Sequence, residues 1–255
     1  MISAPAEVVV FLAVVTAPQP SLLRLLEPAE HERASAFVRP GDRDRFITSH
    51  ALLRLAAGEV FGVSAVTVNL DFTCRVCGGP HGRPSIAQPA VLPGSPSRYA
   101  LSLSTSADRV AVAVARVGDV GVDIDRVDAA QFSGFDTVAL TAREVRAVGR
   151  LGSGDADLAR SQLWVRKEAV LKASGHGLRR EPRTIDVWAK GSTHTGSVDL
   201  DIAATSNTSR VRWIDLDTGV PGLAAAVARV GAEPVHVVVR DAEFLLSAGT
   251  TSGSR

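Results

Sequence analysis

The sequence predicts a mixed α/β fold of the α+β kind, and two features of the chain support this prediction. Runs of β-branched residues alternate with segments whose apolar residues recur at helical spacing. In addition, the hexapeptide AVARVG at residues 113–118 recurs letter for letter at residues 226–231. This repeat indicates a duplicated α/β unit whose halves meet near Gly118, although six residues drawn from so simple an alphabet can also coincide by chance.

The first half contains one strand, a helical region and three further strands. Residues 7–15 form an apolar, β-branched run typical of a buried strand. Residues 21–58 have a helical pattern, and the part from residue 44 onward predicts an amphipathic helix that ends at Gly58. Alternating side chains then predict strands at 66–72, 99–106 and 110–115.

The second half repeats this order with shorter strands. We expect a strand at 121–125, a helix over 164–174 that ends at Gly175, and short strands at 187–188, 198–202, 211–216 and 235–239. The resulting domain prediction is an N-terminal subdomain over 1–118 and a C-terminal subdomain over 119–246. The polar, small residues 247–255 predict a disordered tail.

The composition argues against a nucleic-acid-binding, membrane-spanning or secreted protein. The chain has 255 residues, 45% of them apolar, and a net charge of +1, so it has ample core and no basic excess that would mark a nucleic-acid-binding protein. No apolar run reaches the roughly 20 residues that span a bilayer, and the start lacks the basic segment of a signal peptide. We therefore expect a cytoplasmic protein without membrane or nucleic-acid partners.

Two carboxylates stand on the predicted strand Gly-Val-Asp-Ile-Asp at residues 121–125. Side chains alternate along a strand, so Asp123 and Asp125 point the same way, roughly 6 to 7 Å apart, while Val122 and Ile124 point into the core. Aspartate is poorly suited to a strand interior, so the pair needs either solvent or a hard divalent cation.

Glu168 and Lys172 share one face of the predicted helix over 164–174. Four residues apart, they are compatible with an ordinary surface ion pair. However, only three of the 28 basic residues are lysine, and two of them, Lys167 and Lys172, occur in this helix. A chain so rich in arginine retains lysine where a compact, titratable ammonium matters, unless the placement arose by chance.

The segments GVDID (121–125) and WVRKEAVLKASGHGL (164–178) together resemble the paired signature of 4′-phosphopantetheinyl transferases of the surfactin-synthetase-activating type. That signature is G-[VI]-D-[IVL]-[DE], followed by W-x-x-K-E-[AS]-x-x-K and G-x-G-L, and every position is filled. The resemblance extends to most of residues 30–230. It implies two pseudo-twofold-related α/β subdomains with the active site in the cleft between them. It also implies transfer of 4′-phosphopantetheine from coenzyme A to a serine of acyl or peptidyl carrier proteins, with release of 3′,5′-ADP.

The resemblance assigns the metal and catalytic roles to four residues. Asp123, Asp125 and Glu168 would hold Mg²⁺ against the diphosphate of coenzyme A, which suits an ion that prefers few carboxylates and substrate phosphates. Glu168 would also act as the base that activates the carrier serine, directly or through water. Lys172 would neutralise or protonate the departing 3′,5′-ADP.

Further residues match family positions that contact coenzyme A. Arg45 corresponds to the arginine at the 3′-phosphate, and Arg83, in Gly-Arg-Pro, to a basic residue that reaches the phosphates. Arg33 is a weaker candidate for the same role. Ser104 matches the family strand pattern [FV]-[NS]-[IL]-S-H-[ST], whereas Thr105 stands where the family usually places a histidine that touches the diphosphate. Threonine can donate a hydrogen bond there but carries no charge.

Three other expectations remain open at this point. The D-x-D pair with a distant glutamate also occurs in other Mg²⁺-dependent phosphoryl-transfer enzymes and hydrolases, and Thr105 is compatible with a non-catalytic relative that only binds carrier proteins. The chain length resembles monomeric members that serve polyketide and nonribosomal peptide synthases. Glu144 fits a helix capping box, Thr141 to Glu144, and also lies near an acidic family position.

Cys74, Cys77 and His81 invite two interpretations. Two thiols and an imidazole are typical zinc ligands, but a closed structural site needs four ligands and the chain has no second C-x-x-C. The alternative is a tight turn with reduced thiols, as expected in a reducing compartment.

Overall fold

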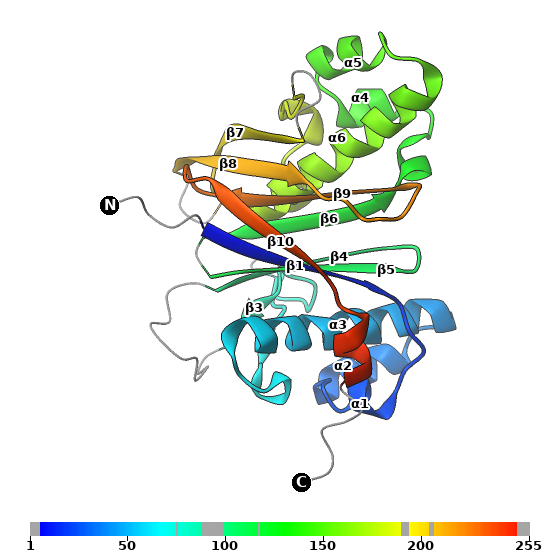
Figure 1. Ribbon diagram of the computed structural model, residues 1–255, viewed down its shortest axis with the longest axis vertical. Helices are drawn as coiled ribbons and strands as arrows, with labels where there is room; N and C mark the ends of the chain where they lie inside the picture. The colour runs from blue at the N-terminus through cyan, green and yellow to red at the C-terminus, as the bar shows by residue number, and fades with distance from the viewer. Residues whose placement is uncertain are drawn as a thin grey trace.

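The computed structural model describes residues 6–74, 76–87, 99–116, 118–189, 194–203 and 207–248. Within these ranges the predicted mixed α/β class is confirmed, with seven α-helices, two four-stranded sheets and a two-stranded ribbon. The two large sheets face each other, and the long helices α3 (Pro40–Phe61) and α6 (Ser153–Ala173) cover their outer faces (Figure 1). The layers therefore follow the order helix, sheet, sheet, helix.

Each of the two large sheets consists of four strands. The first runs β10 (Val235–Asp241), β1 (Ala6–Val14), β5 (Arg109–Ala115) and β4 (Ala100–Ser106). The second runs β6 (Val120–Arg126), β9 (Leu223–Val230), β8 (Thr208–Asp215) and β7 (Thr195–Asp201). All neighbours are antiparallel except β1 and β10, which are parallel.

The two sheets repeat one topology. Three neighbouring strands and one helix correspond: β1, β5 and β4 have the same order and antiparallel pairing as β6, β9 and β8, and α3 corresponds to α6. β10 and β7 are additional edge strands. The repeated hexapeptide occupies equivalent places, because Ala113 of β5 pairs with Val10 of β1 and Ala226 of β9 pairs with Asp123 of β6. The sequence repeat therefore coincides with a structural repeat.

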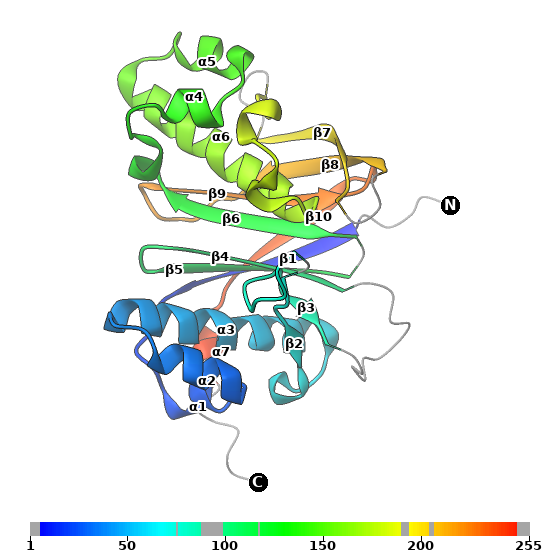
Figure 2. The same cartoon turned by 180° about the vertical axis from the view of Figure 1, so that it is seen from behind.

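A small-residue core joins the sheets. Valine and alanine side chains fill the space between them, and Val122 and Ile124 of β6 belong to this core as their alternation predicts. Because these side chains are short, the inner faces approach closely, and β6 runs beside β4 in both views (Figures 1 and 2). This contact brings the edge of one sheet against the edge of the other.

Several element bounds differ from the sequence prediction. Gly58 lies inside α3, which continues to Phe61 and ends at Gly62, whose φ of 71° suits glycine. Residues 66–72 are not one strand, because a 3₁₀ turn (Ala65–Thr67) precedes a two-residue strand β2 (Leu70–Asp71), and residues 187–188 lie outside any strand. The remaining helices are α1 (Pro20–Leu23), α2 (Pro28–Ser35), α4 (Phe135–Ala139), α5 (Ala142–Val148) and α7 (Glu243–Ala248).

The last segment of the chain returns to the first sheet. β10 pairs with β1, and α7 packs against α3. Residues 235–246, which we predicted to belong to the second subdomain, thus lie against the first, because β10 is hydrogen-bonded to the free edge of β1 and α7 packs on α3. Of the tail predicted at 247–255, Ser247 and Ala248 are the last residues of α7, and the others lie outside the described residues.

Candidate active site

The carboxylates of β6 face a row of serines on β4. Ser104 Oγ donates to Asp123 Oδ1 at 2.7 Å, and Ser106 Oγ donates to Asp125 Oδ1 at 2.7 Å. The matching contacts show that Asp123 and Asp125 lie on one face of β6, as the alternation predicts. Asp123 is only 6% exposed, so these hydrogen bonds replace much of the water that a carboxylate normally holds.

A third serine of β4 fixes the backbone of β6. Ser102 Oγ accepts a hydrogen bond from the Val122 amide at 3.0 Å, which satisfies a donor on the edge of the second sheet. Residues 102, 104 and 106 alternate along β4 and therefore all point toward β6. Sequence reasoning identified Ser104 by resemblance but missed Ser102 and Ser106, although the alternation Ser-Leu-Ser-Thr-Ser was the signal that could have found them.

Helix α6 supplies Lys172 to the same cluster. Its Nζ donates to Asp123 Oδ1 at 2.7 Å and to the Val122 carbonyl at 3.0 Å. Gly121 makes this approach possible, because a Cβ there would lie 2.1 Å from the carbonyl oxygen of Ala169 in α6. The glycine of the GVDID segment therefore allows α6 to cross β6 closely enough for Lys172 to reach the aspartates.

Glu168 is the electrostatically unusual residue of the cluster. Burial raises the pKa of its carboxyl from 4.5 to about 7, the negative charge of Asp123 adds to the rise, and the Lys172 ammonium opposes it. Its Oε1 is buried and has no hydrogen-bond partner. Burial also raises the pKa of Asp123 above its usual range, despite the nearby ammonium and the Ser104 hydroxyl. The carboxyl of Glu168, with a pKa of about 7, therefore exchanges a proton near neutral pH.

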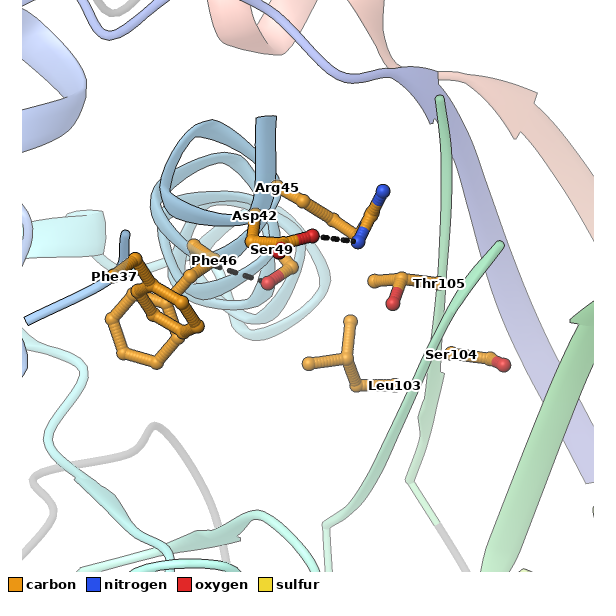
Figure 3. Close-up of a pocket in the computed structure, with 8 residues that line it drawn as sticks. All are labelled: Phe37, Asp42, Arg45, Phe46, Ser49, Leu103, Ser104 and Thr105. Carbon is orange, nitrogen blue, oxygen red and sulfur yellow. Dashed lines mark hydrogen bonds and ion pairs between the residues drawn. The ribbon is translucent and has the colours of Figure 1, made fainter. Parts of the chain in front are cut away.

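A pocket of about 340 Å³ lies beside these carboxylates, between α3 and β4. It brings together three residues predicted to contact coenzyme A, namely Arg45, Ser104 and Thr105 (Figure 3). Arg45 extends from α3 toward β4, where its guanidinium donates to Asp42 Oδ1 and to the carbonyl of Ala107, both at 2.9 Å. The guanidinium is thus held at the pocket by two contacts. The other lining residues are Phe37, Phe46, Ser49 and Leu103.

Ser104 connects the pocket with the carboxylates. It lines the pocket and also donates to Asp123, which in turn accepts from Lys172. Thr105 is the next residue on β4 and points to the opposite face, toward Arg45 (Figure 3). Arg45 and Thr105 therefore lie on the pocket side of β4, and the Ser104 hydroxyl reaches Asp123 on the other side.

Two predicted phosphate contacts are engaged outside the pocket lining. Arg83 forms an ion pair with Asp119, just before β6, with 3.1 Å between Nη2 and Oδ1. Arg33 donates to the carbonyl of Pro80 at 2.7 Å, and its guanidinium lies 5.2 Å from the ring centroid of Phe46. Of the three predicted phosphate contacts, only Arg45 lines the pocket. Arg33 lies against the ring of Phe46, and Arg83 lies at the N-terminal end of β6.

Glu144 has a structural role. It completes the predicted capping box with Thr141, accepts from the Val187 amide at 2.9 Å, and forms a fully buried ion pair with Lys167, with 2.5 Å between Oε2 and Nζ. Lys167 also donates to two backbone carbonyls, of Ala139 and Pro182. All three hydrogen-bond donors of its ammonium are therefore used in these contacts. Of the two lysines of α6, only Lys172 faces the aspartates of β6.

The chemistry of the acidic cluster fits a divalent cation. Asp123, Asp125 and Glu168 supply only hard oxygen donors, and the orphaned, buried Oε1 of Glu168 requires a positive partner. Among the described residues, the only groups of three potential ligands with atoms within 4.8 Å of one another are found at residues 74–81, so the acids are spaced more widely. Binding one ion by all three therefore requires side-chain rotation.

Comparison with known families agrees with this geometry. Residues 119–228 match the family model described as the 4′-phosphopantetheinyl transferase superfamily. Over this segment, which is a little under half of the chain, the protein is similar to that superfamily. The matched segment includes β6 and α6 and hence Asp123, Asp125, Glu168 and Lys172. A comparison with curated proteins finds no match. In the part of the chain that the structure describes, no helix combines the length and apolar character needed to cross a membrane.

Proposed function

We propose that this protein transfers the 4′-phosphopantetheine group of coenzyme A to a serine of a carrier protein, with Mg²⁺ as cofactor and 3′,5′-ADP as product. This is the reaction of a holo-carrier-protein synthase of the surfactin-synthetase-activating type. The observation that carries the proposal is the position of Ser104, which lines the same pocket as Arg45 and donates to Asp123, the partner of Lys172, in the acidic cluster of the matched segment.

In this reaction the carrier serine attacks the phosphorus that bears pantetheine. The bond from serine Oγ to phosphorus forms, the bond from that phosphorus to the bridging diphosphate oxygen breaks, and 3′,5′-ADP leaves. Glu168 accepts the serine proton, and a pKa of about 7 leaves a useful fraction of carboxylate at neutral pH. It would do so either directly or through water.

The other residues bind and orient the donor. Lys172 lies beside Asp123 and would offer its ammonium to the departing phosphate, while Arg45 would hold the 3′-phosphate at the pocket. Thr105 would donate a hydrogen bond to the diphosphate where relatives carry a histidine. Mg²⁺, held by Asp123, Asp125 and Glu168, would supply positive charge to the phosphate oxygens when bound.

Intact mass of a serine-bearing carrier protein tests the proposal. After incubation with this protein, coenzyme A and Mg²⁺, the carrier should gain the mass of one phosphopantetheine. Asp123→Asn should abolish the gain, whereas the matched Asp199→Asn, an exposed carboxylate on β7, should preserve it. An unmodified carrier combined with release of 3′,5′-ADP would instead indicate a hydrolase, and binding of coenzyme A without turnover would indicate a non-catalytic carrier-binding protein in which Thr105 replaces the histidine.

The partners and setting follow from the same resemblance. We infer that acyl and peptidyl carrier domains of polyketide and nonribosomal peptide synthases are the acceptors, and that the protein works in the cytoplasm as a monomer. Assaying carriers of both classes in parallel, with the mass of the protein measured by light scattering, separates these expectations from the basic reaction.

A further inference from the structure

The described residues of the segment 72–84 bury few apolar side chains. The segment connects β2 (Leu70–Asp71) with β3 (Ser85–Ile86), and each of these strands is only two residues long. Figure 2 shows the strands β2 and β3 beside α3, and Arg83 of the segment pairs with Asp119, just before β6. Phe72 stacks on His50 of α3 with 4.6 Å between ring centroids, but Val76, the other large apolar residue of the segment, is 68% exposed. So small a substructure usually requires a covalent or metal staple.

The turn that carries Cys74, Cys77 and His81 is nevertheless well defined. The Cys74 amide donates to the Gly79 carbonyl and the Gly78 amide donates to the Cys74 carbonyl, both at 2.8 Å. Gly78 has a φ of 73°, which is in the left-handed region that glycine tolerates. These bonds reverse the chain so that both cysteines and the histidine face one point.

The three side chains are spaced as ligands of a single ion. One ligand atom of each lies within 4.8 Å of the other two, and Cys77 Sγ is 2.9 Å from His81 Nε2. Tetrahedral zinc, with bonds of about 2.3 Å to sulfur and about 2.1 Å to nitrogen, separates its ligand atoms by about 3.5 to 3.8 Å. Gly79 permits the approach, because a Cβ there would lie 3.1 Å from the His81 ring and 3.4 Å from Cys77 Sγ.

The surroundings of the sulfur also favour a metal. Backbone amides of Val76 and Cys77 donate to the Cys74 sulfur, which is the arrangement that supports a metal-bound thiolate. Both cysteines are free thiols. The sequence from residue 82 to 98 contains no further cysteine, histidine, aspartate or glutamate, so this stretch supplies no fourth ligand.

We propose that Cys74, Cys77 and His81 bind one Zn²⁺ ion, with a water molecule in the fourth position. This zinc site is separate from the acidic cluster of β6 and α6 and fastens the 72–84 segment. Its position gives it a connection to the pocket: Arg33 donates to the carbonyl of Pro80, which lies within the turn, and lies over Phe46, a pocket residue. By holding Pro80 in place, zinc therefore also positions Arg33 against the pocket residue Phe46.

Metal content of untagged protein tests the site. The full chain is reduced, incubated with Zn²⁺, freed of unbound metal by gel filtration and analysed by mass spectrometry of the elements. We expect about one zinc per chain, and at least a tenfold weaker affinity in Cys77→Ser and His81→Ala. The exposed His236→Ala is the matched control and should bind like the unaltered chain. Asp123→Asn should also retain the zinc, which separates this site from the acidic cluster.

Two further readouts keep the test independent of how each variant folds. In the unaltered chain, bound Zn²⁺ should slow the reaction of both thiols with a disulfide reagent, and Co²⁺ should give the near-ultraviolet charge-transfer absorption of a cobalt thiolate. The proposal is overturned if the reduced chain takes up no zinc, if Cys77→Ser and His81→Ala bind as much zinc as His236→Ala, or if thiol reactivity is the same with and without Zn²⁺.

Discussion

Replacing Glu168 with glutamine should stabilise the protein at alkaline pH while abolishing the proposed transfer. The folded chain raises the pKa of this carboxyl from 4.5 to about 7, so between these pH values the folded state binds more protons than the unfolded state. Its contribution to stability is therefore complete below pH 4.5 and is lost as the pH rises through about 7. One pKa unit corresponds to about 1.4 kcal/mol, so the full loss amounts to about 3 kcal/mol.

The neutral amide avoids this loss, because it replaces the protonated carboxyl at every pH. Oε1 has no hydrogen-bond partner, so the substitution breaks no bond at that atom. The stability advantage of Glu168→Gln should grow from under about 1 kcal/mol at pH 5 to about 3 kcal/mol at pH 8. Urea unfolding of both proteins at the two pH values measures it, with the exposed Glu32→Gln as the matched control.

Added Mg²⁺ provides the complementary measurement. At pH 8 the ion should stabilise the unaltered protein, by about 1.4 kcal/mol at ten times its dissociation constant, and should stabilise Glu168→Gln much less. The reasoning about Glu168 is refuted if the difference in unfolding free energy between the two proteins is the same at pH 5 and pH 8.

Three other substitutions address the scaffold and the pocket. Lys167→Met should lower the free energy of unfolding by about 3 to 5 kcal/mol in urea titrations, because it leaves the buried carboxylate of Glu144 unpaired; a loss below about 1 kcal/mol would contradict this. Gly121→Ala should lower both the melting temperature and the activity, since its Cβ would overlap the carbonyl of Ala169 and displace α6; unchanged melting and activity would refute the close-packing role. Arg45→Ala should raise KM for coenzyme A about tenfold or more in steady-state assays with kcat less affected, and an unchanged KM would exclude Arg45 from the donor site.

The parts of the fold that depend on short-range pattern are the ones that sequence predicts. Alternation along residues 121–125 places Asp123 and Asp125 on one face, and the serines opposite them confirm it. The repeated hexapeptide marks equivalent strands, because selection for a short apolar strand between two others acts in both halves. Helix ends are less certain: Gly58 resembles a stop, yet it packs inside α3, where a Cβ would lie 2.8 Å from the carbonyl of Val63.

Features set by contacts between distant segments remained hidden. Lys167 and Lys172 look equivalent in the sequence, but they point to different sides of α6, and only the tertiary structure decides which one meets a buried glutamate and which one meets β6. The choice of β1 as the partner of β10 likewise depends on which edge remains open after both sheets have formed. No local propensity encodes that choice.

The return of β10 to the first sheet has a consequence for how the protein is made. β1 is synthesised before the strands of the second sheet, whereas its neighbour over Val235–Asp241 is synthesised after them. Until that neighbour arrives, one edge of β1 exposes unpaired backbone groups and can pair with other chains. Pairing of β10 with β1 joins segments that are distant in sequence, and such pairing is slow. The chain therefore remains prone to aggregation until β10 has covered this edge.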